Sequence, residues 1–123
     1  MSAVDRLLQI ETLFAAQLAR VVVIELDEEL LRLILYFGDG SNPSTSSGQR
    51  LRVTEQWHGE ALSRYSYYWL TLENELKIGW DNAPHHTRLQ NFPHHKHVGQ
   101  QADMQPSFEI RLEDVMRVIL NSS

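Results

Sequence analysis

The chain has 123 residues, of which 42% are hydrophobic and 22% are charged. These values are typical of one globular domain, residues 1–123, that buries a core of its own. The sequence contains no cysteine, which excludes disulfides, thiolate catalysis and cysteine-ligated metal sites. Its net charge of −5 argues against a nucleic-acid binder that is basic over its whole surface.

The first predicted element is an amphipathic helix over residues 2–18. Ser2 and Asp5 have the spacing of a capping box, in which each side chain bonds to the other's backbone. Apolar residues then recur at helical spacing and define one face: Val4, Leu7, Ile10, Phe14 and Leu18. We expect this helix to cover one face of a sheet.

Two antiparallel strands are predicted next, over 21–24 and 30–37. Both are short and apolar, and acidic residues separate them around 27–29. Apolar residues on both faces favour a central, well-covered position in the sheet. A helix over 25–36 is the competing interpretation, because this stretch contains strong helix formers. A flexible surface loop is predicted over 38–48, which is rich in glycine and serine.

Alternating apolar and polar residues predict three further strands, over 49–59, 62–72 and 75–81. Glu73 and Asn74 make the tight turn before the last of them. Glu55 stands on an otherwise apolar face, so either it faces a pocket or a bulge shifts the register there. The inward-facing residues are predicted to be Leu51, Val53, Glu55, Trp57, Tyr65, Tyr67, Trp69, Leu76, Ile78 and Trp80.

The segment 81–97, "DNAPHHTRLQNFPHHKH", holds five of the six histidines: His85, His86, His94, His95 and His97. Three prolines and the loss of periodicity predict a long His-rich loop over 82–106, and loops of this length are often functional. A short strand at 107–110 and a helix at about 112–120 follow. The predicted fold class is α+β: an N-terminal helix, an antiparallel meander of about five strands and a C-terminal helix.

Two kinds of chemistry fit the histidine cluster. Asp81 and the histidines could supply a nitrogen-and-oxygen set for a metal ion, but they match no established ligand signature, and Lys96 lies among them. Alternatively, histidines can accept and donate protons near neutral pH, which allows RNA cleavage without a metal. We favour this second reading and expect no cofactor. The predicted site has His94 and His97 for proton transfer, His95 as a further proton carrier, Lys96 for phosphate stabilisation, and Asp81 with His85 for orientation or substrate contact.

Basic residues outside the cluster could add contacts to phosphate, provided that the sheet presents them on one side: Arg50, Arg52, Arg64, Lys77 and Arg88. No secretory signal and no apolar run of membrane-spanning length is visible in the sequence. We therefore expect a cytoplasmic protein that does not interact with a membrane.

The stretch "RYSYYWL", the block "DNAPHH" and the block "NFPHHKH" together resemble the TumE-like toxin family. The resemblance covers roughly residues 36–97. It implies the toxin of a type II toxin–antitoxin pair, kept silent by a helix-turn-helix antitoxin protein and acting as an RNA-cleaving enzyme. The alternative is a non-enzymatic metal-binding or protein-interaction domain that uses the His cluster. The sequence leaves a homodimer open.

Overall fold

The computed structural model describes residues 2–38, 49–84 and 88–122. The loop predicted over 38–48 therefore lies outside the described residues, except for Gly38. His85 and His86, two of the five clustered histidines, also lie outside them.

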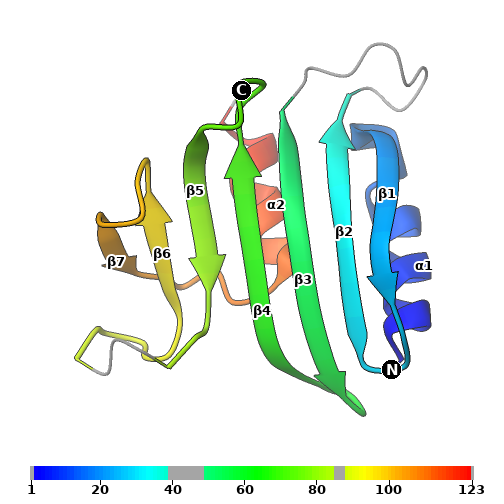
Figure 1. Cartoon of the computed structure of the whole chain (residues 1–123), viewed down its shortest axis with the longest axis horizontal. Helices are drawn as coiled ribbons and strands as arrows, with labels where there is room; N and C mark the ends of the chain where they lie inside the picture. Colours follow the sequence, from blue (N-terminus) through cyan, green and yellow to red (C-terminus); the bar gives the residue numbers. More distant parts are fainter. Residues whose placement is uncertain (1, 39–48, 85–87, 123) are drawn as a thin grey trace.

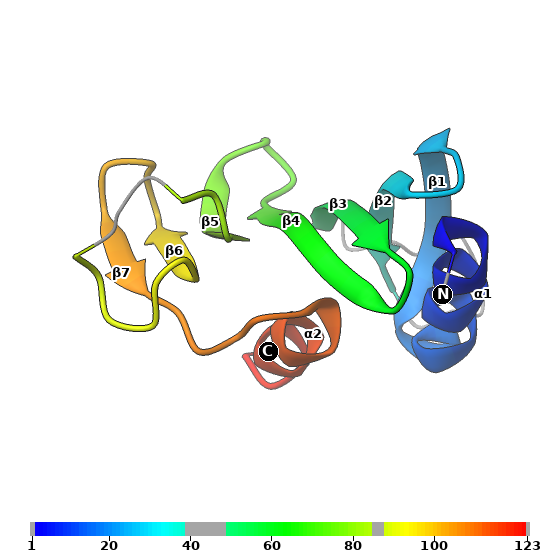
Figure 2. The ribbon, with the colours of Figure 1, turned by 90° about the horizontal axis from the view of Figure 1, so that it is seen from below.

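A single antiparallel sheet forms the centre of the fold, and its strands follow one another in chain order, from β1 at one edge to β7 at the other (Figure 1). Both helices lie on the same side of this sheet (Figure 2). The α+β prediction is confirmed, but the described residues form seven strands rather than about five. The elements are α1 (Ala3–Leu13), a 3-10 turn η1 (Ala15–Gln17), β1 (Leu18–Leu26), β2 (Leu30–Phe37), β3 (Arg50–His58), β4 (Ala61–Leu70), β5 (Leu76–Asp81), β6 (His95–Val98), β7 (Met104–Pro106) and α2 (Leu112–Leu120).

The first helix begins as predicted but ends five residues early. Ser2 and Asp5 form the expected capping box, with each side chain bonded to the other's backbone N–H. Leu18, predicted as the last residue of the helical face, instead begins β1. Val4 was also wrongly assigned to the buried face, because it is 48% exposed while Arg6 is buried. The helix therefore turns a charged residue toward the sheet.

The prediction of a central position for the first strand is wrong, because β1 is an edge strand. Its apolar residues Val23, Ile24 and Leu26 are exposed. The competing helix over 25–36 does not form either. The Asp27 side chain accepts hydrogen bonds from the backbone N–H groups of Glu29 and Leu30, which fixes a tight turn between β1 and β2.

Alternation along β3, β4 and β5 gives the sheet two different faces. The face toward the helices carries the buried core, in which Leu51 pairs with Trp69 and Tyr67 pairs with Trp80 across neighbouring strands. Helix α2 adds the buried side chains predicted for it: Leu112, Val115, Met116 and Ile119. Neither α1 nor α2 lies over the other face, and we call it the open face (Figure 2).

Glu55 lies in the core, at 0% exposure, and does not face a pocket. The pairing of β3 with β4 shifts register directly after it, between Gln56 and Trp57, as the bulge alternative anticipated. Arg6 of α1 reaches it through two hydrogen bonds, of 2.8 and 3.1 Å. Tyr67 and Trp57 donate to the same carboxylate over 2.6 and 3.0 Å. Arg6 also binds Glu113 of α2, so this ionic group joins both helices to the sheet.

The segment predicted as one loop over 82–106 contains two strands, β6 and β7. β6 is only four residues long and follows Pro93, so its alternation was too short to read in the sequence. The strand predicted at 107–110 lies instead at 104–106, and Phe108 and Ile110 are exposed. Within the described ranges, the helices are too short or too polar to cross a membrane.

Candidate active site

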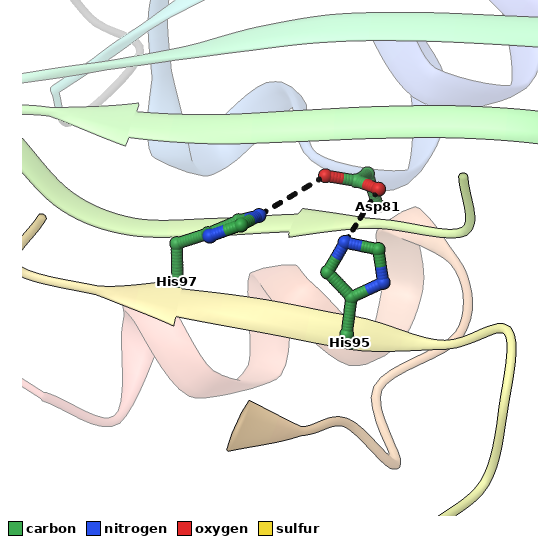
Figure 3. Close-up of side chains that lie close together, drawn as sticks. All are labelled: Asp81, His95 and His97. Atoms are coloured by element: carbon green, nitrogen blue, oxygen red, sulfur yellow. Dashed lines mark ion pairs between the residues drawn. The ribbon is translucent and has the colours of Figure 1, made fainter. Parts of the chain in front are cut away.

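Three side chains from β5 and β6 meet on the open face, as Figure 3 shows. Asp81 lies opposite His95 and Gly79 lies opposite His97 in the antiparallel pairing of these strands. Trp80 points into the core, so alternation turns Asp81 the other way, and His95 and His97 follow it. We call Asp81, His95 and His97 the His–Asp cluster.

The Asp81 carboxylate lies between the two imidazoles. His95 Nε2 is 2.9 Å from Oδ1, and His97 Nε2 is 3.5 Å from Oδ2. The backbone N–H of Ala83 donates to Oδ1 over 3.0 Å, and the Tyr68 hydroxyl donates to Oδ2 over 3.4 Å. All three residues of the cluster are more than nine-tenths buried.

The other nitrogen of each imidazole bonds to a backbone carbonyl. His95 Nδ1 is 3.0 Å from the oxygen of Pro93, and His97 Nδ1 is 2.7 Å from the oxygen of Gln101. A carbonyl oxygen only accepts hydrogen bonds, so each Nδ1 carries the hydrogen. When these imidazoles are neutral, the lone pair of each is therefore on Nε2, the atom that faces Asp81.

The carboxylate oxygens of Asp81 and the Nε2 atoms of two neutral imidazoles are all hydrogen-bond acceptors, and this arrangement brings them together. A carboxylate and two Nε2 lone pairs have no hydrogen to share, unless a proton or a metal cation lies among them. The 2.9 Å contact of His95 is short enough for a charge-assisted hydrogen bond, in which His95 is protonated on Nε2. The cluster is thus built to hold a proton or a cation, and a proton can also be exchanged with a bound molecule.

A hollow of about 390 Å³ gives access to the cluster. Besides the cluster itself, it is lined by Arg64, Tyr65, Ser66, Tyr68, Ala83 and Gln101. Another hollow lies on the helix side, near Trp69 and Ile119, and the only cation lining it among the described residues is Lys77. The Lys77 ammonium lies over the Trp69 ring, 4.0 Å from its centre, so this second hollow offers no comparable chemistry.

Tyr68 owes its position to Gly79 on the neighbouring strand. A Cβ at residue 79 would overlap the Tyr68 ring, so only glycine lets this ring lie across β5 toward Asp81. Burial raises the pKa of Tyr68, and the negative charge of Asp81 raises it further. The phenol therefore stays protonated and acts as a donor to the carboxylate.

Two of the other residues predicted for the site, Lys96 and His94, lie away from the cluster. Lys96 points to the helix side, where its ammonium is 3.3 Å from Glu109. His94 also lies on that side, with Nδ1 2.8 Å from the Tyr65 hydroxyl. Burial lowers the pKa of His94, and the charge of His95 lowers it further. His85 lies outside the described residues, so the structure brings together His95, His97 and Asp81 of the six predicted residues.

Tyr68 and Gly79 were missed as site residues. The sequence did carry a signal for Tyr68, because alternation in "RYSYYWL" places it opposite the core residues Tyr65 and Tyr67. The part played by Gly79 depends on the register between β4 and β5, which puts Gly79 opposite Tyr68 and which the sequence analysis did not assign.

Exposed arginines lie on the same open face as the cluster. Arg52 pairs with Tyr68, and Arg64 lines the hollow itself. Farther across the sheet, Arg20 lies over the ring of Tyr36, 4.3 Å from its centre. The exposed arginines of this face are Arg20, Arg32, Arg52 and Arg64, with Glu25 beside Arg32 at 3.6 Å. Arg50 is half-buried and bonds to Asn74 and to the Thr71 carbonyl.

Fold and site define a class: a small α+β protein with two helices on one face of an antiparallel sheet and a buried His–Asp cluster on the other. The chain matches the family described as Toxin TumE over residues 6–122, nearly its whole length, and belongs to this family. Comparisons with curated proteins and with solved structures give no match. Family membership gives the chain the function of a toxin and implies an antitoxin as its partner.

Proposed function

We propose that this toxin is an RNA-cleaving enzyme that requires no metal and uses the His–Asp cluster for acid–base catalysis. The observation that carries the proposal is the convergence of two imidazoles on one buried carboxylate, at the edge of an accessible hollow. Histidine can donate and accept protons near neutral pH, and the carbonyl partners of the two Nδ1 atoms leave both Nε2 atoms for this work.

The cluster suggests separate roles for the two histidines. The longer Asp81 contact, of 3.5 Å, leaves His97 Nε2 the freer of the two to take the proton from a ribose 2′-OH. The 2′-oxygen then attacks the adjacent phosphorus, and the bond from phosphorus to the 5′-oxygen breaks. His95, protonated on Nε2, gives its proton to this leaving oxygen. The products are a 2′,3′-cyclic phosphate and a free 5′-OH, and no water is consumed.

Asp81 holds both rings in place, while Arg64 replaces Lys96 as the proposed contact to phosphate. Arg64 lines the hollow, whereas Lys96 lies on the opposite face beside Glu109. The guanidinium group is suited to this task because its donors match two phosphate oxygens at once. Arg20, Arg32 and Arg52 extend a basic track across the open face, on which the RNA backbone would lie.

The direct test is incubation of the purified chain with RNA in EDTA. Wild type should cleave, and His97→Ala should be slower by about 10²–10⁴-fold, the usual contribution of a positioned acid or base. His58→Ala is the matched control, because His58 is exposed at the end of β3. No cleavage by folded wild type, or equal cleavage by His97→Ala, would contradict the proposal.

The arginines provide a second test. Arg52→Gln and Arg64→Gln should each weaken RNA binding and reduce the slope of log affinity against log salt by about one if one phosphate contact is lost. Arg117→Gln is the control, because Arg117 is exposed on α2, away from the open face. Equal losses for all three variants would show that only net charge matters.

The proposed partner is a helix-turn-helix antitoxin, and RNA as the target fits action in the cytoplasm. Co-expression with a candidate helix-turn-helix antitoxin should give a stable complex that no longer cleaves RNA. The mass of the free toxin in solution would show whether it also forms a homodimer.

A further inference from the structure

We propose that the His–Asp cluster is a binding site for one borderline divalent transition-metal ion, of which Zn²⁺ is the representative. Asp81, His95 and His97 offer two imidazole nitrogens and a carboxylate oxygen, all within 4.8 Å of one another. A set of imidazole and carboxylate ligands without thiolate suits Zn²⁺ and its neighbours in the first transition row.

The spacing within the cluster is close to that around a shared ion. Two ligand atoms bound to one Zn²⁺ at about 2.0–2.2 Å lie roughly 3–3.5 Å apart. His95 Nε2 is 2.9 Å from Oδ1 of Asp81, His97 Nε2 is 3.5 Å from Oδ2, and one ligand atom from each of the three residues lies within 4.8 Å of the others. The imidazole planes of His95 and His97 cross at 84°, so the rings are not stacked and can approach one ion from different sides.

The surroundings of the three side chains are those of metal ligands. A metal-bound histidine usually donates its other N–H to a carbonyl or carboxylate, which fixes the ring and the tautomer. Both histidines have such a partner, in the carbonyls of Pro93 and Gln101. The Asp81 carboxylate is held in the same way, by the Ala83 N–H and the Tyr68 hydroxyl. Small movements of the Asp81, His95 and His97 side chains would bring their ligand atoms to bonding distance from one ion.

Charge also favours a cation here. Lys96 stands among the histidines in the sequence, where its positive charge would oppose a metal ion. In the structure, the Lys96 ammonium is on the other face, beside Glu109. Arg64 is the cation that lines the hollow among the described residues, and its side chain is exposed. The hollow next to the cluster leaves room for water or another molecule to complete the coordination.

Metal binding would also regulate the toxin, a consequence that rests on the proposed function. An ion bound to Nε2 of both histidines would take the lone pairs that proton transfer requires. Zn²⁺ should therefore inhibit RNA cleavage, and EDTA should restore it. Binding itself can be measured without RNA, so the two proposals can fail separately.

The experiment is titration of the metal-stripped full chain with Zn²⁺ in a calorimeter, followed by Co²⁺ as a spectroscopic probe. One ion should bind per chain, and His97→Ala and Asp81→Asn should each lose at least the roughly 10–100-fold that removal of an outer-shell partner costs. The control is His58→Ala, which should keep the site, because His58 is exposed at the end of β3. Circular dichroism would establish that each variant is folded.

If the variants fail to fold, the site can still be tested by NMR of the wild-type protein. On addition of Zn²⁺, the ¹⁵N resonances of the two Nε2 atoms of His95 and His97 should shift, while the Nδ1 hydrogens stay in place. Absence of Zn²⁺ binding by wild type, or equal binding by folded His97→Ala, would overturn the site. If Zn²⁺ binds but cleavage continues or increases, the inhibitory role is wrong and the site stands. If metal-free wild type does not cleave RNA, only the proposed function fails.

Discussion

Two carboxylates are buried in the part of the chain that the structure describes, and their surroundings are opposite: Glu55 lies on the helix side and Asp81 on the open face. Glu55 receives hydrogen bonds from Arg6, Tyr67 and Trp57, all of which are permanent donors near neutral pH. Burial raises the pKa of Tyr67, and the charge of Glu55 raises it further, so this phenol keeps its hydrogen. Asp81 instead faces the Nε2 atoms of two imidazoles, and histidine is the side chain type that can donate and accept protons near neutral pH.

This difference suggests a structural role for Glu55 and a chemical role for Asp81. A guanidinium cannot give up its proton, so the charges of Arg6 and Glu55 are fixed and bind the helices to the sheet. An imidazole can be neutral or charged, so we expect the His–Asp cluster to tolerate alteration better, in keeping with its proposed exchange of protons or a cation. Burial alone would not distinguish the two sites, since both carboxylates are almost wholly enclosed.

The largest effect on stability is expected from Arg6→Met. This change leaves Glu55 charged and buried with only two neutral donors, and breaking a buried pair in this way costs about 3–5 kcal/mol. Urea denaturation measures the loss. The matched control is Arg32→Met, because Arg32 and Glu25 form an exposed pair at 3.6 Å, which contributes about 0–1 kcal/mol. Equal losses in the two variants would contradict the structural role of Glu55.

A smaller loss is expected from Gly79→Ala on the open face. The new methyl group would push the Tyr68 ring aside, and overpacking of this kind costs about 1–3 kcal/mol. Cleavage should fall as well, because Asp81 loses its contact with the Tyr68 hydroxyl. Adding Tyr68→Ala to the same chain removes the overlap, so the stability cost of Gly79→Ala should disappear in that background. A cost that persists there would show that the ring is not its cause.

The smallest expected effect is a pH dependence at Glu113. Burial acts to raise the pKa of this carboxyl, but hydrogen bonds from Arg6 and its positive charge outweigh burial and hold the pKa below the ordinary value of 4.5. A carboxyl whose pKa is lower in the folded state stabilises that state above the ordinary value, and the contribution disappears as pH falls through the lowered one. Glu113→Gln should therefore be less stable than wild type at pH 7, by about 1 kcal/mol, with the gap closing below pH 4. Denaturation at several pH values tests this, and a gap independent of pH would contradict it.

The sequence predicted the sheet better than it predicted the site, for a physical reason. Alternation over nine or more residues is a strong signal, and it gave the bounds of β3 and β4 to within two residues. The apolar run over 30–37 gave β2 with the same bounds as the structure. The four residues of β6 gave no such signal after Pro93, so His94, His95, Lys96 and His97 were read as one cluster. In a strand, neighbouring side chains point to opposite faces, and this divides them into two pairs.

Contacts between residues far apart in the chain also could not be predicted from the sequence. Arg6 and Glu55 are 49 residues apart, and their hydrogen bonds depend on how α1 lies against β3. Asp81 was predicted as an orienting residue, and the structure puts it beside His95 and His97, which supports that proposed role. What distinguishes these histidines from His94 is the face of the sheet on which each lies.

Asp81 is proposed to act in RNA cleavage, whereas Glu55 stabilises the fold. A paired comparison of Asp81→Asn with Glu55→Gln tests this distinction most directly. RNA cleavage is measured per folded molecule, with the unfolding free energy of each variant measured beside it. Asp81→Asn should lose about 100-fold or more in cleavage but only about 1 kcal/mol in stability, because the neutral amide can still accept from the Ala83 N–H and can donate to an imidazole Nε2. Glu55→Gln should lose about 3–5 kcal/mol and cleave normally wherever it is folded. Normal cleavage by Asp81→Asn, or a folded but inactive Glu55→Gln, would contradict the claim.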